Sequence, residues 1–219
     1  MSMEKETVYR EELIRICRKL EERGLIAAAD GNVSCRLEGE RLLITPSGVP
    51  KGELRPLDLL VTDLQGKVLR GQSKASSEIR MHLAAYEKRP DIHAVVHAHP
   101  PLLTAFTVAG IPFGADVLPE VWLTIGAVPT AAYATPSTPE VPDSIEPFFA
   151  GHQAILLERH GSLTLGRTLQ EAYLRLEKLE HAAHTLFYSY LLGQRMPSPL
   201  SESALAKLGQ LVPGPFPKL

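Results

Sequence analysis

The amino-acid sequence predicts a single α/β domain in which helices cover a largely antiparallel sheet. Segments with helical periodicity alternate with short apolar runs, in the order helix, hairpin strands, helix, strand, helix, strands, helix. Short polar turns join successive strands, which is how antiparallel neighbours are connected. A chain of 219 residues also suits one domain, since about 150 residues per domain is the usual prior. We expect one domain over residues 1–219, with its core at about 7–193 and a proline-rich tail at about 196–219.

Periodicity and glycine turns define the elements of the first half. Residues 8–25 place apolar side chains at helical spacing, and Gly24 ends that helix. The following segments indicate, in order, strands near 33–37 and 41–45, a second hairpin over 59–71 around Gly66, and a helix from Ser76 that ends before Pro90.

The second half begins with an apolar strand over residues 94–99 and a helix over 100–110. Residues 111–150 are rich in proline, threonine and short apolar runs, and they indicate no particular element. Residues 154–166 predict a strand pair broken at Gly161, and the longest helix follows over 168–193.

Charge and composition exclude several classes of partner. The formal net charge of -2 argues against a general binder of nucleic acid or of anionic membranes. No apolar run approaches the ~20 residues of a membrane span. The charged N-terminal segment precedes no apolar stretch, so we expect no signal peptide. Cys17 and Cys35 do not make a disulfide framework, which favours a cytoplasmic location.

Two histidines in the segment AVVHAHPP are the first candidates for chemistry. His97 and His99 are two residues apart, so on a strand they share one face. His160, in ERHGS, is the best third ligand, because it also ends an apolar strand and precedes a flexible glycine. Three neutral imidazoles with an open position are a common pattern for catalytic zinc. The alternative is that hydrogen bonds satisfy these rings and no metal binds.

The other five histidines lack this setting. His181 and His184 lie three residues apart in the long helix, where a solvated or packing role is expected. His82, His93 and His152 have no paired partner, and we expect them to be structural or exposed.

The segment SKASSEIRMH combines hydroxyl groups and a carboxylate at a predicted helix start. Ser76 and Ser77 could cap the helix, and the same hydroxyls with free backbone amides form a natural phosphate site. Glu78 lies directly beside them. The alternative is that the two hydroxyls only cap the helix and that Glu78 interacts favourably with the helix dipole, with no ligand bound.

Two glycine-containing turns, GNVS and TPSG, offer further donors. Asn32, Ser47 and Gly48 could present amide and hydroxyl groups to an anion. Such turns by themselves are most often only turns.

Taken together, GNVS, ITPSG, SSE, VVHAHP and RHG, in this order and at these separations, resemble the class II aldolase/adducin family. The likeness is greatest to the zinc-dependent fuculose-1-phosphate aldolases, and it runs from the first helix to about residue 193. The resemblance implies a three-layer α/β/α sandwich. It also implies a homotetramer whose active sites lie between subunits.

The same resemblance assigns roles to individual residues. It implies one Zn²⁺ per chain, held by His97, His99 and His160. It implies that Glu78 is the catalytic acid/base and a fourth metal ligand when substrate is absent. The phosphate of a sugar phosphate would be held by Gly31, Asn32, Ser47, Gly48, Ser76 and Ser77.

The implied reaction is the reversible cleavage of a ketose 1-phosphate to dihydroxyacetone phosphate and an aldehyde. Zinc would stabilise the enediolate left when the bond between carbons 3 and 4 breaks. Glu78 would protonate carbon 3. The alternatives within the superfamily are a decarboxylase, a dehydratase or a 4-epimerase, although related epimerases carry an aspartate at the position of Glu78. A non-catalytic adducin-like module is the alternative from another class, but it need not keep all four metal-site residues.

One departure from the family bears on the aldehyde. Fuculose-1-phosphate aldolases carry a tyrosine after an I-P dipeptide, and it protonates the aldehyde oxygen from a neighbouring subunit. Here the segment GIPFGADV places Ala115, Asp116 or Val117 at that position. Tyr133 lies too far along the chain to replace it.

Overall fold

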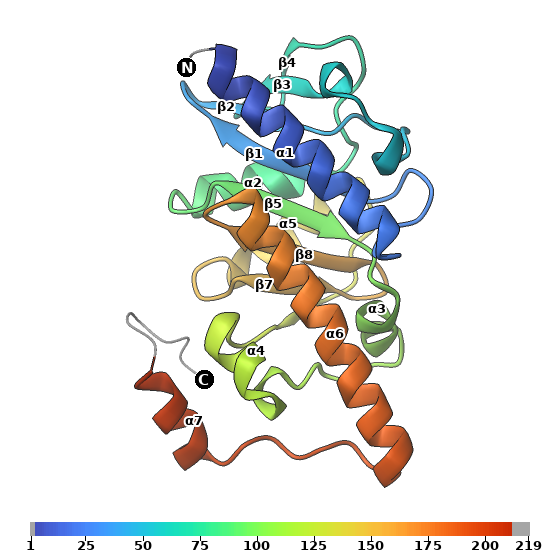
Figure 1. Cartoon of the computed structure of the whole chain (residues 1–219), viewed down its shortest axis with the longest axis vertical. Helices are drawn as coiled ribbons and strands as arrows, with labels where there is room; N and C mark the ends of the chain where they lie inside the picture. The colour runs from blue at the N-terminus through green and yellow to red at the C-terminus, as the bar shows by residue number, and fades with distance from the viewer. Residues whose placement is uncertain (1–2, 212–219) are drawn as a thin grey trace.

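The computed structural model of the protein describes residues 3–211 and shows a sheet with helices on both faces (Figure 1). Eight strands lie in the order β4-β3-β2-β1-β5-β8-β7-β6. The strands are β1 (Asn32–Leu37), β2 (Arg41–Ile44), β3 (Leu60–Asp63), β4 (Val68–Arg70), β5 (Ala94–Ala98), β6 (Thr130–Ala131), β7 (Ala154–Leu157) and β8 (Gly161–Gly166). Within this sheet β6 pairs in parallel with β7, and the other neighbours are antiparallel.

The helices form the outer two layers. In Figure 1, α1 and α6 cross the near face of the sheet, while α2 and α5 lie behind it. The helices are α1 (Met3–Glu22), α2 (Ile79–Lys88), α3 (Pro101–Val108), α4 (Pro119–Thr124), α5 (Glu140–Ile145), α6 (Leu169–Gly193) and α7 (Glu202–Gly209). The fold is therefore the three-layer α/β/α arrangement with a mixed, largely antiparallel sheet that the sequence predicts.

Alternation along β1 explains why a polar site can form inside this core. Val33 and Cys35 point toward the apolar cluster that α1 and α6 cover. Ser34, between them, points to the opposite face, where its hydroxyl lies 2.8 Å from the hydroxyl of Tyr86 in α2. The face of β1 that meets α2 thus carries polar side chains into the interior.

A buried carboxylate anchors the helix that follows the histidine pair. Glu180 of α6 accepts hydrogen bonds from the backbone N–H groups of Leu102 (3.0 Å) and Leu103 (2.8 Å). These amides belong to the first turn of α3, where N–H groups have no partner within the helix. Glu180 therefore caps α3 and fixes the chain just after His99.

The predicted helices and strands outside residues 111–150 are confirmed to within a few residues. The largest difference is at the first helix, which starts at Met3 and not near residue 8. The helix expected from Ser76 starts at Ile79, and its N-cap is Glu78, so the expected cap by Ser76 or Ser77 is wrong. The hydroxyl of Ser76 accepts a hydrogen bond from the Glu78 amide at 3.3 Å, so Ser76 shapes the turn that precedes the helix. Residues 111–150 contain α4, β6 and α5, each too short for its periodicity to be recognised.

The proline-rich tail contains α7, which packs near α4, and the backbone N–H of Leu200 donates to the carbonyl oxygen of Asp116. The end of the expected tail, residues 212–219, lies outside the described residues. Within residues 3–211, no helix combines the length and the apolar character needed to cross a membrane.

Gly161 at the start of β8 permits a close approach between two strands. A Cβ added there would overlap the carbonyl oxygen of Ala98 and lie 2.8 Å from Cδ2 of His99. Gly161→Ala should therefore destabilise the protein by ~1–3 kcal/mol, the usual range for overpacking. Gly151→Ala is the matched control, because a Cβ there meets no atom within 4 Å. Urea denaturation measures both free energies of unfolding, and equal values for the two variants would contradict this account.

Candidate active site

The candidate site lies where β5 ends between β1 and β8. His97, in β5, pairs with Asn32 on one side and with Leu163 on the other. Nδ1 of His97 lies 3.0 Å from the carbonyl oxygen of Ser162. Because a carbonyl oxygen can only accept, Nδ1 carries the proton, and the Nε2 lone pair is free for another partner.

Three imidazoles and one carboxylate converge at this point. Nε2 of His99 lies 2.9 Å from Nε2 of His97. Oε1 of Glu78 lies 3.0 Å from Nε2 of His160, and Oε2 of Glu78 lies 3.2 Å from Nε2 of His97. One ligand atom from each of the four residues lies within 4.8 Å of all the others. The structure thus brings together the four residues that the sequence assigns to a metal.

Three segments of the chain supply these ligands. His97 is in β5, and His99 follows it directly. His160 lies in the turn between β7 and β8, and Glu78 immediately precedes α2. Nδ1 of His99 lies 3.6 Å from a carboxylate oxygen of Asp30, which leaves Nε2 directed toward the other imidazoles.

The electrostatics of the cluster keep its ligands in the forms that bind a metal. Burial by itself would raise the pKa of Glu78, but the neighbouring His160 and His97 hold that pKa well below its ordinary value. Burial, together with the neighbouring His97 and His160, lowers the pKa of His99 to about 4. An ionised carboxylate and a neutral imidazole are the ligand forms.

The donor set fits a divalent transition metal. Imidazole nitrogens and a carboxylate oxygen suit zinc and its neighbours. Oε1 of Glu78 is buried and, apart from its 3.0 Å contact with Nε2 of His160, has no hydrogen-bond partner among the described residues, as expected for an oxygen that a cation would satisfy. The structure therefore contains a site at which His97, His99, His160 and Glu78 could hold one metal ion.

The residues predicted to bind phosphate line the same cavity as three of the four candidate metal ligands. This cavity has a volume of about 290 Å³. Glu78, His99 and His160 form part of its wall. The predicted phosphate-binding residues in that wall are Gly31, Asn32, Ser47, Gly48, Ser76 and Ser77.

Gly31 shows why a glycine is needed between the two parts of the site. Its φ of +69° lies in the left-handed region. A Cβ there would lie 2.7 Å from Cγ2 of Ile26 and 2.9 Å from the carbonyl oxygen of His97. The turn can therefore pack against the strand that carries the histidine pair only if this residue has no side chain.

Lys51 is a site residue that sequence reasoning missed. Its side chain is buried (1% exposed) and lines the cavity. Its ammonium donates to the carbonyl oxygens of Ala29 (2.7 Å) and Val49 (2.8 Å), and so joins the two glycine-containing turns. Burial lowers the pKa of Lys51. A lysine in a turn resembles a solvated surface residue, so only the TPSG turn before it could have pointed to this position.

His82 is a second residue whose place the sequence does not indicate. It is fully buried in α2, its Nδ1 lies 2.7 Å from the hydroxyl of Ser34, and its Nε2 contacts the side-chain oxygen of Asn32. Burial lowers the pKa of His82 to about 3, so the ring is neutral. The spacing of four residues between Glu78, His82 and Tyr86 predicts that all three share one helix face. It does not predict which strand residues that face meets.

The remaining histidines lie away from the cluster. His93 precedes β5 and contacts the ring of Tyr9 in α1, with ring centroids 5.4 Å apart. His152 donates to the carbonyl oxygen of Phe148, and His181 and His184 are exposed on α6, as expected.

The positions considered for the missing tyrosine are also separate from the cavity. Ala115, Asp116 and Val117 form a short 3-10 turn, and Tyr133 is largely exposed. Within the described chain, none of these residues lines the cavity that holds the metal ligands.

A three-layer fold with three imidazoles and a carboxylate in an open polar cavity defines the class of protein: a metal-dependent enzyme. The model of the "Class II Aldolase and Adducin N-terminal domain" matches residues 11–187. The chain belongs to the class II aldolase and adducin family, and it is a lyase of that family.

Relatives of this chain include both aldolases and decarboxylases. The chain is 34% identical over 172 residues to an L-fuculose phosphate aldolase of Methanococcus maripaludis, covering 78% of this chain and 92% of that protein. It is also 34% identical over 207 residues to a 3-oxo-tetronate 4-phosphate decarboxylase of Escherichia coli, covering 93% and 96%. A solved L-fuculose 1-phosphate aldolase superposes with a TM-score of 0.85 at 30% identity, covering 93% of this chain and 95% of that one.

Removal of one imidazole tests the metal site directly. His160→Ala should weaken Zn²⁺ binding by more than the ~10–100-fold that changes beyond the ligands typically cause, because it deletes a ligand. Isothermal titration of the metal-free protein with Zn²⁺ measures this affinity. His93→Ala is the control, since His93 lies outside the cluster, and it should bind Zn²⁺ as the wild type does. Unchanged binding by His160→Ala would contradict the assignment.

Proposed function

We propose that this protein is a zinc-dependent aldolase that reversibly cleaves a ketose 1-phosphate, of the L-fuculose 1-phosphate type, to dihydroxyacetone phosphate and an aldehyde. One observation carries the proposal. A single cavity contains the metal cluster and the turns that carry Gly31, Ser47 and Ser76. A substrate that joins a carbonyl to a phosphate over a few carbon atoms matches this arrangement.

The donor set supports zinc as the metal. Three histidines with an additional exchangeable position are typical of catalytic zinc sites. When bound, the ion would supply positive charge that stabilises the negative charge developing on the substrate oxygens. His97, His99 and His160 would hold it, one ion per chain. Nδ1 of His97 is already fixed by the carbonyl oxygen of Ser162, which sets the direction of Nε2.

The opposite part of the cavity supports phosphate binding. Gly31 and Gly48 belong to turns with positive φ, and such turns can direct backbone N–H groups at an anion. The hydroxyls of Ser47, Ser76 and Ser77 add donors that need no charge. The buried ammonium of Lys51 contributes a positive charge close to both turns. Asn32 uses one amide N–H toward Glu78, and its second N–H remains for a ligand.

Glu78 is the residue to which we assign proton transfer. Cleavage moves one proton, overall, from the hydroxyl on carbon 4 to carbon 3, while the bond between these carbons breaks. Glu78 delivers the proton to carbon 3. In the reverse direction its carboxylate removes the same proton from dihydroxyacetone phosphate, for which an ionised group is required.

Decarboxylation is the second candidate, and one specific observation favours it. The segment that should supply the aldehyde-protonating tyrosine reads GIPFGADV, and decarboxylation releases no aldehyde that needs such a proton. The metal and phosphate parts of the cavity would serve either reaction. Both reactions would release dihydroxyacetone phosphate, so the distinction depends on whether the second product is an aldehyde or carbon dioxide.

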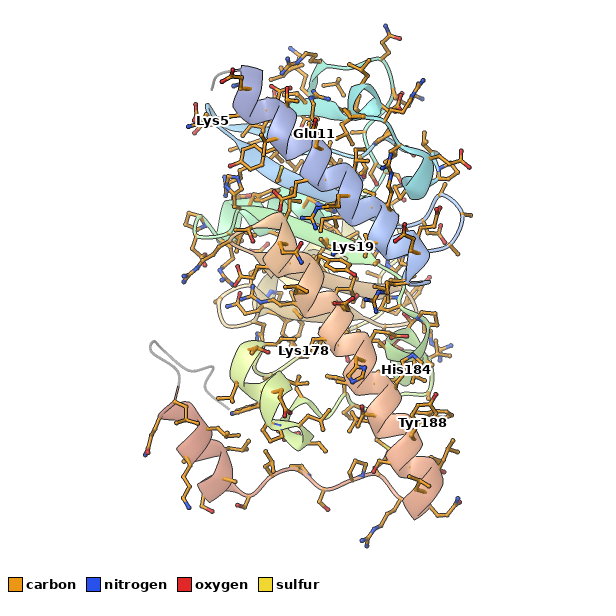
Figure 2. The ribbon with its side chains drawn as sticks, viewed as in Figure 1. Lys5, Glu11, Lys19, Lys178, His184 and Tyr188 are labelled. Carbon is orange, nitrogen blue, oxygen red and sulfur yellow. The ribbon has the colours of Figure 1, made fainter. Side chains whose placement is uncertain are left out.

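We further propose a homotetramer with active sites at subunit interfaces, in the cytoplasm. Large apolar side chains are exposed on the last turns of α6, where Figure 2 labels Tyr188. They are Phe187, Tyr188, Tyr190, Leu191 and Leu192. Grouped exposed apolar side chains are typical of interfaces. Both cysteines are free and buried, which suits a reducing compartment.

A product assay decides between the two reactions. The zinc-loaded protein should release dihydroxyacetone phosphate from L-fuculose 1-phosphate, and it should release no carbon dioxide from 3-oxo-tetronate 4-phosphate. EDTA should abolish the activity and Zn²⁺ should restore it, because the metal stabilises the developing charge. Decarboxylation of 3-oxo-tetronate 4-phosphate also leaves dihydroxyacetone phosphate, so the second product decides. Release of carbon dioxide from that acid, with no cleavage of L-fuculose 1-phosphate, would establish the decarboxylase instead.

Substitution of Glu78 separates proton transfer from metal binding. Glu78→Gln keeps the size of the side chain but removes the base, so the three histidines should still bind Zn²⁺. Exchange of the carbon-3 proton of dihydroxyacetone phosphate with deuterated water should fall ~10²–10⁴-fold, the usual effect of losing a general base. Proton NMR follows this exchange. Exchange near the wild-type rate would show that Glu78 is not the base.

A further inference from the structure

A continuous line of buried side chains runs from α2 to Glu78. Asn32 and Ser34, two residues apart on β1, face three residues spaced by four along α2 and its N-cap. These are Glu78, which immediately precedes the helix, and His82 and Tyr86 within it. Two strand residues span ~6.6 Å and four helical residues span ~6 Å. Because the two spacings nearly match, side chains from the helix segment and from β1 take alternate places along the line.

Each neighbouring pair in this line is in hydrogen-bond contact. The hydroxyl of Tyr86 lies 2.8 Å from Oγ of Ser34, and that Oγ lies 2.7 Å from Nδ1 of His82. Nε2 of His82 contacts Oδ1 of Asn32. Nδ2 of Asn32 donates to Oε2 of Glu78 at 3.0 Å. Ser34 and His82 are fully buried and Tyr86 and Asn32 are 2% exposed, so water does not compete for these bonds.

The carboxylate fixes the direction of every bond in the line. Glu78 can only accept when ionised, so the amide nitrogen of Asn32 must face it. A reversed amide would place two acceptor oxygens about 3 Å apart in a buried site, which is costly. Oδ1 of Asn32 therefore faces His82, whose Nε2 must carry the proton. Nδ1 of His82 then accepts from Ser34, and Ser34 accepts from Tyr86.

The two oxygens of Glu78 differ as a result. Oε2 accepts the Asn32 hydrogen bond at the end of the line. Oε1 is buried and, apart from its 3.0 Å contact with Nε2 of the candidate metal ligand His160, has no hydrogen-bond partner among the described residues. One oxygen is anchored to the protein, and the other is available.

We propose that His82 is a positioning residue for the reaction: in its Nε2–H form it orients the Asn32 amide, which anchors Oε2 of Glu78 and leaves Oε1 as the oxygen that exchanges protons with the substrate. This inference rests on the proposed function for the identity of the proton transfer. The geometry of the line itself does not depend on which sugar phosphate is bound.

The state of the His82 ring can be read in the wild-type protein without any assay of activity. Long-range ¹H–¹⁵N correlation spectra of protein labelled with [¹⁵N]histidine distinguish a protonated from an unprotonated ring nitrogen. We expect a protonated Nε2 and an unprotonated Nδ1, with the His82 signals identified by their loss in His82→Asn. A protonated Nδ1 would overturn the proposal, because the Asn32 amide would then lack its partner.

A pair of substitutions tests the effect on catalysis. The amide nitrogen of a glutamine can reach the position of Nε2, whereas the shorter asparagine reaches only the position of Nδ1. His82→Asn should lower kcat and the deuterium exchange about 10- to 100-fold, as is typical for residues that orient a catalytic group. KM and bound Zn²⁺ should stay unchanged. His82→Gln should retain most of kcat, and His93→Gln is the control for the same change outside the line.

The outcomes separate this proposal from the proposed function. If the wild type releases no dihydroxyacetone phosphate from L-fuculose 1-phosphate, the proposed function fails, and the spectrum still decides the state of His82. If the wild type is active but the asparagine and glutamine variants lose kcat equally, His82 does not act through its Nε2–H. If both variants have a lower melting temperature but an unchanged kcat, the role of His82 is merely structural, and the proposal is wrong.

Discussion

The burial of one carboxylate among three imidazoles is the interaction on which the rest of the structure depends. An isolated buried charge costs several kcal/mol, so the Glu78 carboxylate requires cationic or donor groups around it. His97, His99 and His160 supply three nitrogens at the cluster, and Asn32 supplies a donor from behind. The lone pairs of these nitrogens and oxygens all have a partner only when a cation binds between them. Without a cation, the ring nitrogens and carboxylate oxygens of this set repel one another. The fold must therefore hold these groups in place with rigid elements.

The antiparallel pairing of β1, β5 and β8 provides that rigidity. The Asn32–His97 and His97–Leu163 pairs fix three neighbouring strands in register at the point where the ligands emerge. Two local arrangements, the Glu180 cap on α3 and the hydrogen-bonded turn of Ser76 before α2, fix the direction of the chain on either side of the site. His99, His160 and Glu78 thus lie on connections, whereas strands β1, β5 and β8 set their geometry.

The parts of the site that could be predicted from sequence are those with local periodicity or a recognisable motif. His97 and His99 share a strand face, and the glycine after His160 lets the two segments approach closely. His82 and Lys51 could not be found in this way. The role of His82 appears only when a helix spacing of four is placed against a strand spacing of two, which is a tertiary relation. Lys51 lies in a short turn whose polar composition gives no sign of burial. The elements within residues 111–150 were missed because each is at most six residues long.

The ammonium of Lys51, held by two backbone carbonyl oxygens, has a consequence for how the protein can change over time. Carbonyl dipoles solvate a cation but do not neutralise it, so the empty protein carries a buried charge that an anionic ligand would balance. A neutral residue at this position would relieve the folded state of that charge and weaken its hold on anions. The charge on Nζ of Lys51 thus lowers the stability of the folded protein and raises its affinity for an anion. A lysine at this position therefore favours binding of an anion at the expense of the stability of the ligand-free protein.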